Sequence, residues 1–295
     1  MRVLIIKTEA AGDVLRTSVL LHKFSANHEI HWYVSQSNTC LLNHGYVNKI
    51  ITSSDRLSNF YDYVISLEDD ENLVKSIFSN INYEKLFGIY YDHGTLSYTK
   101  NSSEWNDMGL ISKYGLKKAN QLKYENKKAY QEILFNGLGY KFVGEKYILP
   151  FKNYDSSLKG DIAVAPKAGS RWPNKNWYYY DELVNLLSKK YIVNILPKRS
   201  SILEHIADIK NHKMVISNDS FPMHIAIGLN IPTVAFFTCT SPHEIYNYGK
   251  LLKLVSPKLE EFFFQKKYSI EAVKSIRLDE AYSRIEKFIA ANNLF

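Results

Sequence analysis

Residues 217–240 read SNDSFPMHIAIGLNIPTVAFFTCT, a pattern that predicts the end of one strand, a turn, a short helix and a second strand. Asp219 or Ser220 can cap the helix, and Pro222 falls in its first turn, where a missing N–H costs nothing. The apolar run 233–237 suits a strand that is buried on both faces, as the strands of a parallel sheet are.

Polar residues gather where this helix begins. Asp219, Ser220 and His224 come just past the C-terminal end of a strand, the edge at which open parallel sheets bind ligands. Free backbone N–H groups and the helix dipole favour an anion at such a place. A helix cap and a buried histidine would explain the same residues, so this stretch alone leaves an anion site and a purely structural role equally open.

A second loop brings three cations to the same edge. Residues 166–177 read PKAGSRWPNKNW and follow a predicted strand at 161–165. Lys167, Arg171 and Lys175 all belong to this loop. Because the C-terminal ends of parallel strands share one edge of a sheet, we expect these cations to converge on the anion that the helix after residue 219 would bind.

The N-terminus opens with a strand, a turn and a helix. Residues 2–7 are apolar, 8–12 are mostly small, and Asp13 begins an amphipathic helix, which is a Rossmann-like opening. The chain has neither the G-x-G-x-x-G fingerprint nor a Walker lysine, which excludes the usual dinucleotide and P-loop sites. Asp13 is either a helix N-cap or a carboxylate that faces the ligand edge and serves as a base.

The totals indicate a globular protein of two domains. The chain has 295 residues, of which 45% are hydrophobic and 23% charged. Cys40 and Cys239 are its two cysteines, too few for a disulfide framework or a cysteine-rich metal site. The first apolar run is too short for a signal peptide, and no run approaches the roughly 18 residues of a membrane span, so we expect a cytoplasmic protein.

Charge is unevenly distributed. The net charge is +7; residues 1–150 contain 17 Lys+Arg and 16 Asp+Glu, and the remainder contains 20 and 14. The basic second half suits a phosphorylated ligand. No helix-turn-helix, RNP or zinc-finger pattern supports a nucleic-acid partner.

Two tandem domains follow from the order of the remaining elements. A stretch rich in glycine near residues 143–160 predicts a linker, so we expect domains at 1–150 and 151–295, both doubly wound α/β and facing a cleft. The closing helix is a candidate to pack back on the first domain. The other predicted strands are 29–34, 47–51, 61–67, 85–91, 191–196, 213–217 and 251–255, and the helices are 72–81, 177–190, 200–210 and 278–290.

Two charged clusters have alternative interpretations. The acidic run at 68–71 could hold a metal ion, but acidic residues are typical of a helix start, which we favour. Residues 113–128 contain six lysines and one glutamate. A solvated helical face is the usual explanation. The alternative is a collar for an anionic acceptor or a membrane surface, with Lys113, Lys117 and Lys118 as candidate acceptor contacts.

Three motifs, in order along almost the whole chain, resemble those of glycosyltransferase family 9, the ADP-heptose:lipopolysaccharide heptosyltransferases. They are MRVLIIKT with Gly12-Asp13 at the N-terminus, Lys175-x-Trp177, and DSFPMH at residues 219–224. The last resembles the family's D-[ST]-G-P-x-H element, with Phe221 in place of the glycine.

The resemblance implies a GT-B fold and inverting glycosyl transfer without a metal or other cofactor. It implies that Asp13 is the catalytic base. The donor diphosphate would be held by residues of the same motifs, namely Lys175, Asp219, Ser220 and His224, with Gly12, Phe221 and Pro222 beside them and Lys167 and Arg171 as further phosphate contacts. An aspartate with the reference pKa of about 3.9 is ionised at pH 7 and can accept a proton.

The expected reaction moves a heptose-like sugar from a nucleotide donor, ADP-heptose by the resemblance, to a hydroxyl of a bacterial surface glycan such as the lipopolysaccharide or lipooligosaccharide core. The expected partners are the nucleotide sugar, an anionic glycan or glycolipid, and the cytoplasmic face of the inner membrane. Alternatives are another nucleotide sugar, a protein acceptor, a sugar-nucleotide epimerase, or a binding module for polyanions without catalysis.

Overall fold

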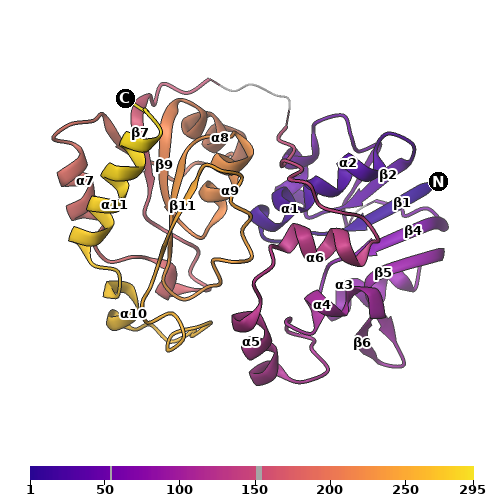
Figure 1. The fold of residues 1–295 in the computed structure, drawn as a ribbon. Helices are drawn as coiled ribbons and strands as arrows, with labels where there is room; N and C mark the ends of the chain where they lie inside the picture. Colours follow the sequence, from indigo (N-terminus) through magenta and orange to yellow (C-terminus); the bar gives the residue numbers. More distant parts are fainter. Residues whose placement is uncertain (54, 151–154) are drawn as a thin grey trace. The chain divides into compact units, whose positions relative to one another are not determined.

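The computed structural model describes residues 1–53, 55–150 and 155–295. The chain divides into two compact units, Met1–Phe151 and Lys152–Phe295, and each contains its own sheet (Figure 1). The predicted α/β class with two sheets in tandem is confirmed. The predicted linker spans this division, and residues 151–154 of it lie outside the described part.

Unit 1 is built on a six-stranded sheet in the order β3-β2-β1-β4-β5-β6. Every neighbouring pair is parallel except the last, where β6 runs antiparallel to β5. The sequence analysis did not predict β6. The strands are β1 (Arg2–Ile6), β2 (Glu29–Tyr33), β3 (Lys49–Ile51), β4 (Phe60–Ser66), β5 (Asn82–Asp92) and β6 (Thr95–Tyr98).

Both faces of this sheet are covered. Leu4 and Ile6 of β1 pack in a cluster with Ile77 of α3, while Val3 and Ile5, which point to the other face, are also fully buried. Because β1 lies inside the sheet and is covered on both faces, its consecutive residues 3–6 must all be apolar. The helices of unit 1 are α1 (Ala11–Thr17), α2 (Leu21–Phe24), α3 (Glu71–Phe78), α4 (Ser103–Asn106), α5 (Leu116–Glu125) and α6 (Tyr130–Gly137).

The acidic run at 68–71 is a helix start, as predicted. Asp70 is the N-cap of α3 and accepts a hydrogen bond from the Leu73 N–H at 2.8 Å, and Glu71 lies in the first turn. Its first member, Glu68, has a different role. That side chain is buried and pairs with Lys7, which is described with the site below.

Unit 2 contains a five-stranded, fully parallel sheet in the order β11-β10-β9-β7-β8. Its strands are β7 (Gly160–Ala165), β8 (Val193–Ile195), β9 (His212–Asn218), β10 (Thr233–Phe237) and β11 (Leu251–Val255). Its helices are α7 (Tyr180–Leu187), α8 (Ile202–Lys210), α9 (Phe221–Gly228), α10 (Ile270–Lys274) and α11 (Leu278–Ala291).

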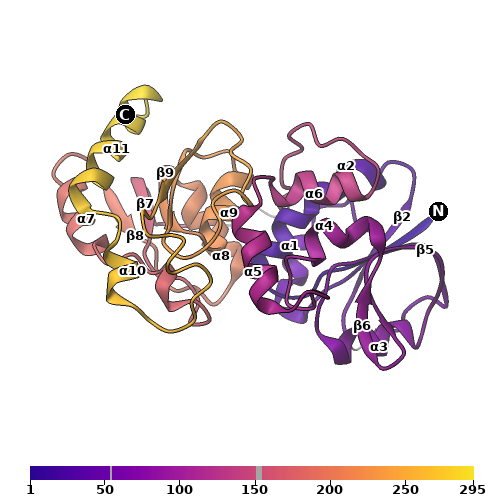
Figure 2. The same ribbon diagram turned by 60° about the horizontal axis from the view of Figure 1, so that its bottom comes forward.

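Helices cover both faces of the second sheet too. Figures 1 and 2 show α7 and α11 on one side of the strands and α8 and α9 on the other. Leu183 of α7 and Ile285 of α11 share a core with Phe236 of β10. Among the helices of the described ranges, none is both long and apolar enough to cross a bilayer.

Strand order locates a ligand edge in each unit. In unit 1 the chain builds outward from β1 to β2 and β3 and then returns to place β4 on the other side of β1. In unit 2 it places β8 on one side of β7 and β9 on the other. Open parallel sheets bind ligands at such switch points, beyond the carboxyl ends of the two strands. The loops after β1 and β4, and those after β7 and β9, therefore lie at the expected ligand edges.

Candidate functional site

Loop 166–177 follows β7 and is fixed by side chains at both ends. Asn218, the last residue of β9, donates to the Pro166 carbonyl at 2.9 Å and accepts from the Trp177 N–H at 3.4 Å. The Trp177 ring is buried and stacks on Phe236 with centroids 4.1 Å apart. Aromatic stacking and hydrogen bonds to buried groups hold the loop in one conformation. The backbone that carries Lys175 is therefore held in place.

Lys175 forms an ion pair across the switch point of unit 2. Its Nζ donates to the Asp219 carboxylate Oδ2 and to the Asp219 main-chain carbonyl, both at 2.8 Å. The Thr240 hydroxyl, from the loop after β10, donates to the same Oδ2 at 2.8 Å. Three loops thus meet at one carboxylate oxygen.

The surroundings of Asp219 keep it ionised. Burial alone would raise its pKa, but the charge and hydrogen bond of Lys175, the nearby His224 and the Thr240 hydroxyl together lower the pKa from 3.8 to about 2. Two of the predicted donor residues, Lys175 and Asp219, are therefore bound to each other, and His224 is close enough to act on them electrostatically.

This ion pair should make the stability of the protein depend on acid pH. Because the pKa of Asp219 is lowered on folding, the stabilisation is complete above pH 4 and is lost as the pH falls toward 2. A difference between 3.8 and about 2 corresponds to about 2.4 kcal/mol. We expect Asp219→Asn to lower the free energy of unfolding at pH 6 and to lower it about half as much at pH 3, measured with urea.

The exposed Asp155 supplies the control, since its substitution by asparagine should change neither value. An Asp219→Asn protein with the same deficit at both pH values would contradict the assignment of a depressed pKa to this carboxylate.

Helix α9 begins at the predicted place. Ser220 is its N-cap residue and Pro222 lies in its first turn. The Ser220 hydroxyl does not cap the helix, however, because it contacts Ser217 Oγ at 3.2 Å and the Asn218 carbonyl at 3.4 Å. Phe221, which replaces the glycine of the motif, places its ring against His205 of α8, with centroids 6.3 Å apart.

The other two cations of loop 166–177 are exposed. Lys167 and Arg171 lie on the surface of the same loop that fixes Lys175. Their convergence on a bound anion stays a prediction.

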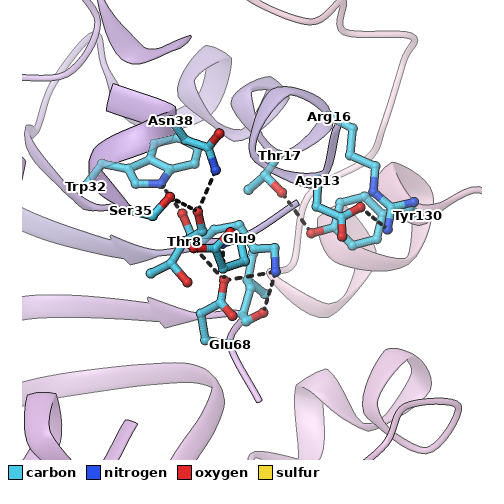
Figure 3. Close-up of polar contacts among 12 residues, drawn as sticks. Thr8, Glu9, Asp13, Arg16, Thr17, Trp32, Ser35, Asn38, Glu68 and Tyr130 are labelled. Carbon is cyan, nitrogen blue, oxygen red and sulfur yellow. Dashed lines mark hydrogen bonds and ion pairs between the residues drawn. The ribbon is translucent and has the colours of Figure 1, made fainter. Parts of the chain in front are cut away.

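In unit 1, the loop after β1 is held by the loop after β4. Glu68 accepts hydrogen bonds from Lys7 Nζ at 3.0 Å and from the N–H groups of Thr8 and Glu9 (Figure 3). On its other side, the Thr8 carbonyl accepts from Ser35 and Asn38 at 3.0 and 2.9 Å. This turn is rigid and leads directly into α1.

Asp13 is the third residue of α1, so the prediction that it begins or caps the helix is wrong. The N-cap is Ala10, and the Asp13 N–H already donates to the Ala10 carbonyl at 2.7 Å. The Asp13 carboxylate instead pairs with Arg16, Oδ1 to Nη2 at 2.9 Å. Gly12, which precedes it, is buried in the first turn.

Lys7 lies close enough to Asp13 for their charges to interact. Burial would lower the pKa of Lys7, but the negative charges of Asp13 and Glu68 outweigh this and raise its pKa above 10.5. Lys7 therefore stays charged beside Asp13. The switch point of unit 1 thus contains an Asp13 carboxylate with two cations, Lys7 and Arg16, around it.

The lysine-rich segment does contain an exposed helix, α5, but several of its cations have partners. Lys113 lies 3.6 Å from Asp107 and over the Tyr114 ring, and Lys118 donates to Gln121 at 3.2 Å. Lys117 is exposed. An acceptor contact for these residues stays a prediction.

Three side chains that bind the predicted site residues were not predicted from the sequence. They are Asn218, Thr240 and Arg16. Asn218 had a signal, because it is the last residue of a buried strand at the ligand edge. Thr240 and Arg16 carried none, since their partners are decided by the tertiary fold. Within the described part of the chain, no group of three or more His, Cys, Asp or Glu side chains is placed to hold a metal ion.

Two findings come from comparison with known sequences. Residues 172–272 match the sequence profile of glycosyltransferase family 9 (heptosyltransferase). Lipopolysaccharide heptosyltransferase 1 of Campylobacter coli is 29% identical over 294 residues, which cover 81% of this chain and 84% of that protein.

Two solved structures share the fold along almost the full length. Escherichia coli heptosyltransferase WaaC with ADP matches with a TM-score of 0.59 and 19% identity over 99% of this chain and 100% of that one. E. coli ADP-heptose lps heptosyltransferase II matches with a TM-score of 0.62 and 15% identity at the same coverage. Lys175, Asp219, His224 and Thr240 all lie within the segment that the family profile matches.

Proposed function

The chain belongs to glycosyltransferase family 9, and from this premise we propose that it transfers a heptose from ADP-heptose to a hydroxyl of a lipopolysaccharide core. The donor is supported by the names of the two E. coli enzymes, and the acceptor by that of the Campylobacter relative. The main support for the proposal is that each sheet has a polar cluster at its switch point. In unit 1 it contains Asp13 and Arg16, and in unit 2 it contains Lys175 and Asp219.

The polar cluster at the switch point of unit 1, a partly exposed carboxylate beside Lys7 and Arg16, supports the role of a base for Asp13. The carboxylate takes the proton of the acceptor hydroxyl while that oxygen bonds to the anomeric carbon. The bond from this carbon to the diphosphate oxygen breaks, its electron pair leaves with ADP, and the configuration of the carbon inverts. Attack opposite to the leaving group needs no covalent intermediate on the protein.

The unit 2 cluster supports binding of the departing diphosphate. Lys175 has three N–H donors, and the two contacts to Asp219 leave its position well defined. The start of α9, which follows Asp219 directly, places the positive end of a helix dipole beside it. Each preorganised donor at a developing negative charge is worth about 3 kcal/mol in such reactions.

ADP should stabilise the protein if this donor site is correct. A ligand at 100 times its Kd adds about 2.7 kcal/mol to the free energy of unfolding. We expect ADP and ADP-heptose to raise the melting temperature in a thermal-shift assay and the uridine and guanosine diphosphates to do so less. A melting temperature that no nucleoside diphosphate changes would remove the donor-site assignment.

We propose that the transfer is independent of metal, because lysine and helix donors supply the positive charge. Activity should persist in excess EDTA, measured as ADP released in the presence of both substrates. Loss of activity on chelation, with recovery on adding Mg²⁺ or Mn²⁺, would contradict this. A parallel reaction without acceptor should release almost no ADP, whereas an epimerase would convert the donor in either case.

A further inference from the structure

Arg16 is a buried cation next to the proposed base. It lies one helical turn after Asp13, and its side chain is 10% exposed, against 33% for that of Asp13. Arginine is almost never buried unless it is paired. The burial of Arg16 therefore means that its position is set by the fold and that the more exposed Asp13 is held to it.

An aromatic ring from a distant helix fixes the guanidinium. The Arg16 Cζ lies 4.0 Å from the ring centroid of Tyr130 in α6, and 5.6 Å from that of Trp105 in α4. Figure 3 shows the Arg16 side chain beside the Tyr130 ring. Tyr130 is itself anchored, since its hydroxyl lies 2.9 Å from Thr17 Oγ1 and its ring packs edge-on against Trp105. Arg16 is therefore held by cation–π contacts with rings of α4 and α6, and the hydrogen bond between Tyr130 and Thr17 fixes α6 against α1.

Titratable groups from several elements lie near Asp13. Arg16 is on α1 itself, Lys7 follows β1, Glu68 follows β4 and Tyr130 belongs to α6. Lys7 is shared with Glu68, to which it is bonded at 3.0 Å. Arg16 contacts the Asp13 carboxylate directly, with Nη2 2.9 Å from Oδ1.

We propose that Arg16, held in place by the ring of Tyr130, is a positioning residue for the transfer: it fixes the orientation of the Asp13 carboxylate toward the acceptor hydroxyl. The inference rests on the proposed role of Asp13 as the base. In the step itself the acceptor proton moves to Asp13, and Arg16 keeps its own protons throughout because its pKa is far above the working pH.

Two opposing consequences of Arg16 can be compared in size. A cation beside a carboxylate makes it a weaker base. Removing the charge of Arg16 would therefore raise the rate at most about tenfold for each unit by which the carboxylate pKa rises. Loss of orientation is larger, because a misplacement of about 1 Å can cost about 10²-fold. Positioning therefore dominates, and removing Arg16 should slow the reaction.

The test compares Arg16→Met, which keeps the buried stem and removes the charge, with Arg16→Lys, which keeps the charge and removes the planar group that stacks on Tyr130. We expect Arg16→Met to lower kcat about 10- to 100-fold with the KM for ADP-heptose little changed. The acidic limb of the kcat/KM profile should move to higher pH, because removing a positive neighbour raises the carboxylate pKa.

Arg16→Lys should retain the pH profile and lose about tenfold in kcat, and it decides the question if Arg16→Met folds poorly. Arg277→Met, which removes an exposed pair with Asp279, is the matched control and should be silent.

A double variant separates this inference from the proposed base. If Arg16 acts through Asp13, Arg16→Met should lower kcat less than about twofold in an Asp13→Asn background. A full, independent loss there, or a higher acceptor KM with unchanged kcat and pH profile, would overturn the positioning role and make Arg16 a substrate contact. If Asp13→Asn alone stays near the wild-type rate, the proposed base fails instead.

Discussion

Asp13→Asn is expected to lower kcat by about 10²–10⁴-fold, the range for loss of a general base. Asparagine has nearly the same shape but cannot take the proton of the acceptor hydroxyl. Donor binding and the melting temperature should barely change, because Asp13 is a third exposed and does not cap α1. The amide oxygen can still accept the hydrogen bond from Arg16.

The matched control is Asp70→Asn in the same unit. Asp70 caps α3, and asparagine caps a helix about as well as aspartate, so this protein should have wild-type stability and activity. Steady-state rates with ADP-heptose and a core acceptor that lacks heptose give the comparison. An Asp13→Asn enzyme that transfers sugar at nearly the wild-type rate would show that the base lies elsewhere.

Lys175→Met should produce the second large effect, on both activity and stability. If Lys175 donates to the leaving diphosphate, as proposed, its removal should lower kcat/KM by about 10²–10³-fold, with a higher KM for the donor. Asp219 would remain buried without its ion-pair partner. Breaking a buried pair in this way costs about 3 kcal/mol in the free energy of unfolding.

The double variant Lys175→Met/Asp219→Asn distinguishes the two effects. With both charges removed, most of the stability should return, because the cost comes from the unpaired carboxylate. Activity should not return, since the donor to the diphosphate is still missing. Lys189→Met, at an exposed lysine after α7, is the control. If the double variant regained activity along with stability, Lys175 would have only a structural role.

The parallel strands could be predicted well because each is a short apolar run that must be buried on both faces. The predicted bounds of β10 and β11, at 233–237 and 251–255, agree with the structure to the residue. Helix α7 was predicted to span 177–190 but spans Tyr180–Leu187. Trp177 lies in the preceding loop because it stacks on Phe236, a tertiary contact that overrides the periodic pattern.

Strand β6 was missed although the sequence carries a signal for it. His93 and Gly94 join β5 to β6, and both have positive φ, 45° and 90°. A two-residue connection of this kind matches the right-handed twist of an antiparallel hairpin. The His-Gly pair between two strand-like stretches could therefore have indicated the hairpin.

The candidate site was predictable in its residues but not in its pairing. Strand order brings the loops after β7 and β9 together, so Lys175 and Asp219 had to lie near one another. That they form an ion pair, with Thr240 on the same oxygen, depends on side-chain positions that no local pattern encodes. The contact of Arg16 with Tyr130 joins helices more than a hundred residues apart, and only the packing of α6 determines it.

The proposed heptosyl transfer to a lipopolysaccharide core can be measured in a single reaction. The purified protein is incubated with ADP-heptose and a core acceptor that lacks heptose, and the product is analysed by mass spectrometry and by NMR of the new anomeric centre. We expect an acceptor heavier by one heptose residue, one ADP released for each heptose transferred, and an inverted anomeric configuration. An unchanged acceptor, with a protein that does bind ADP, would mean that the enzyme does not transfer heptose to this core.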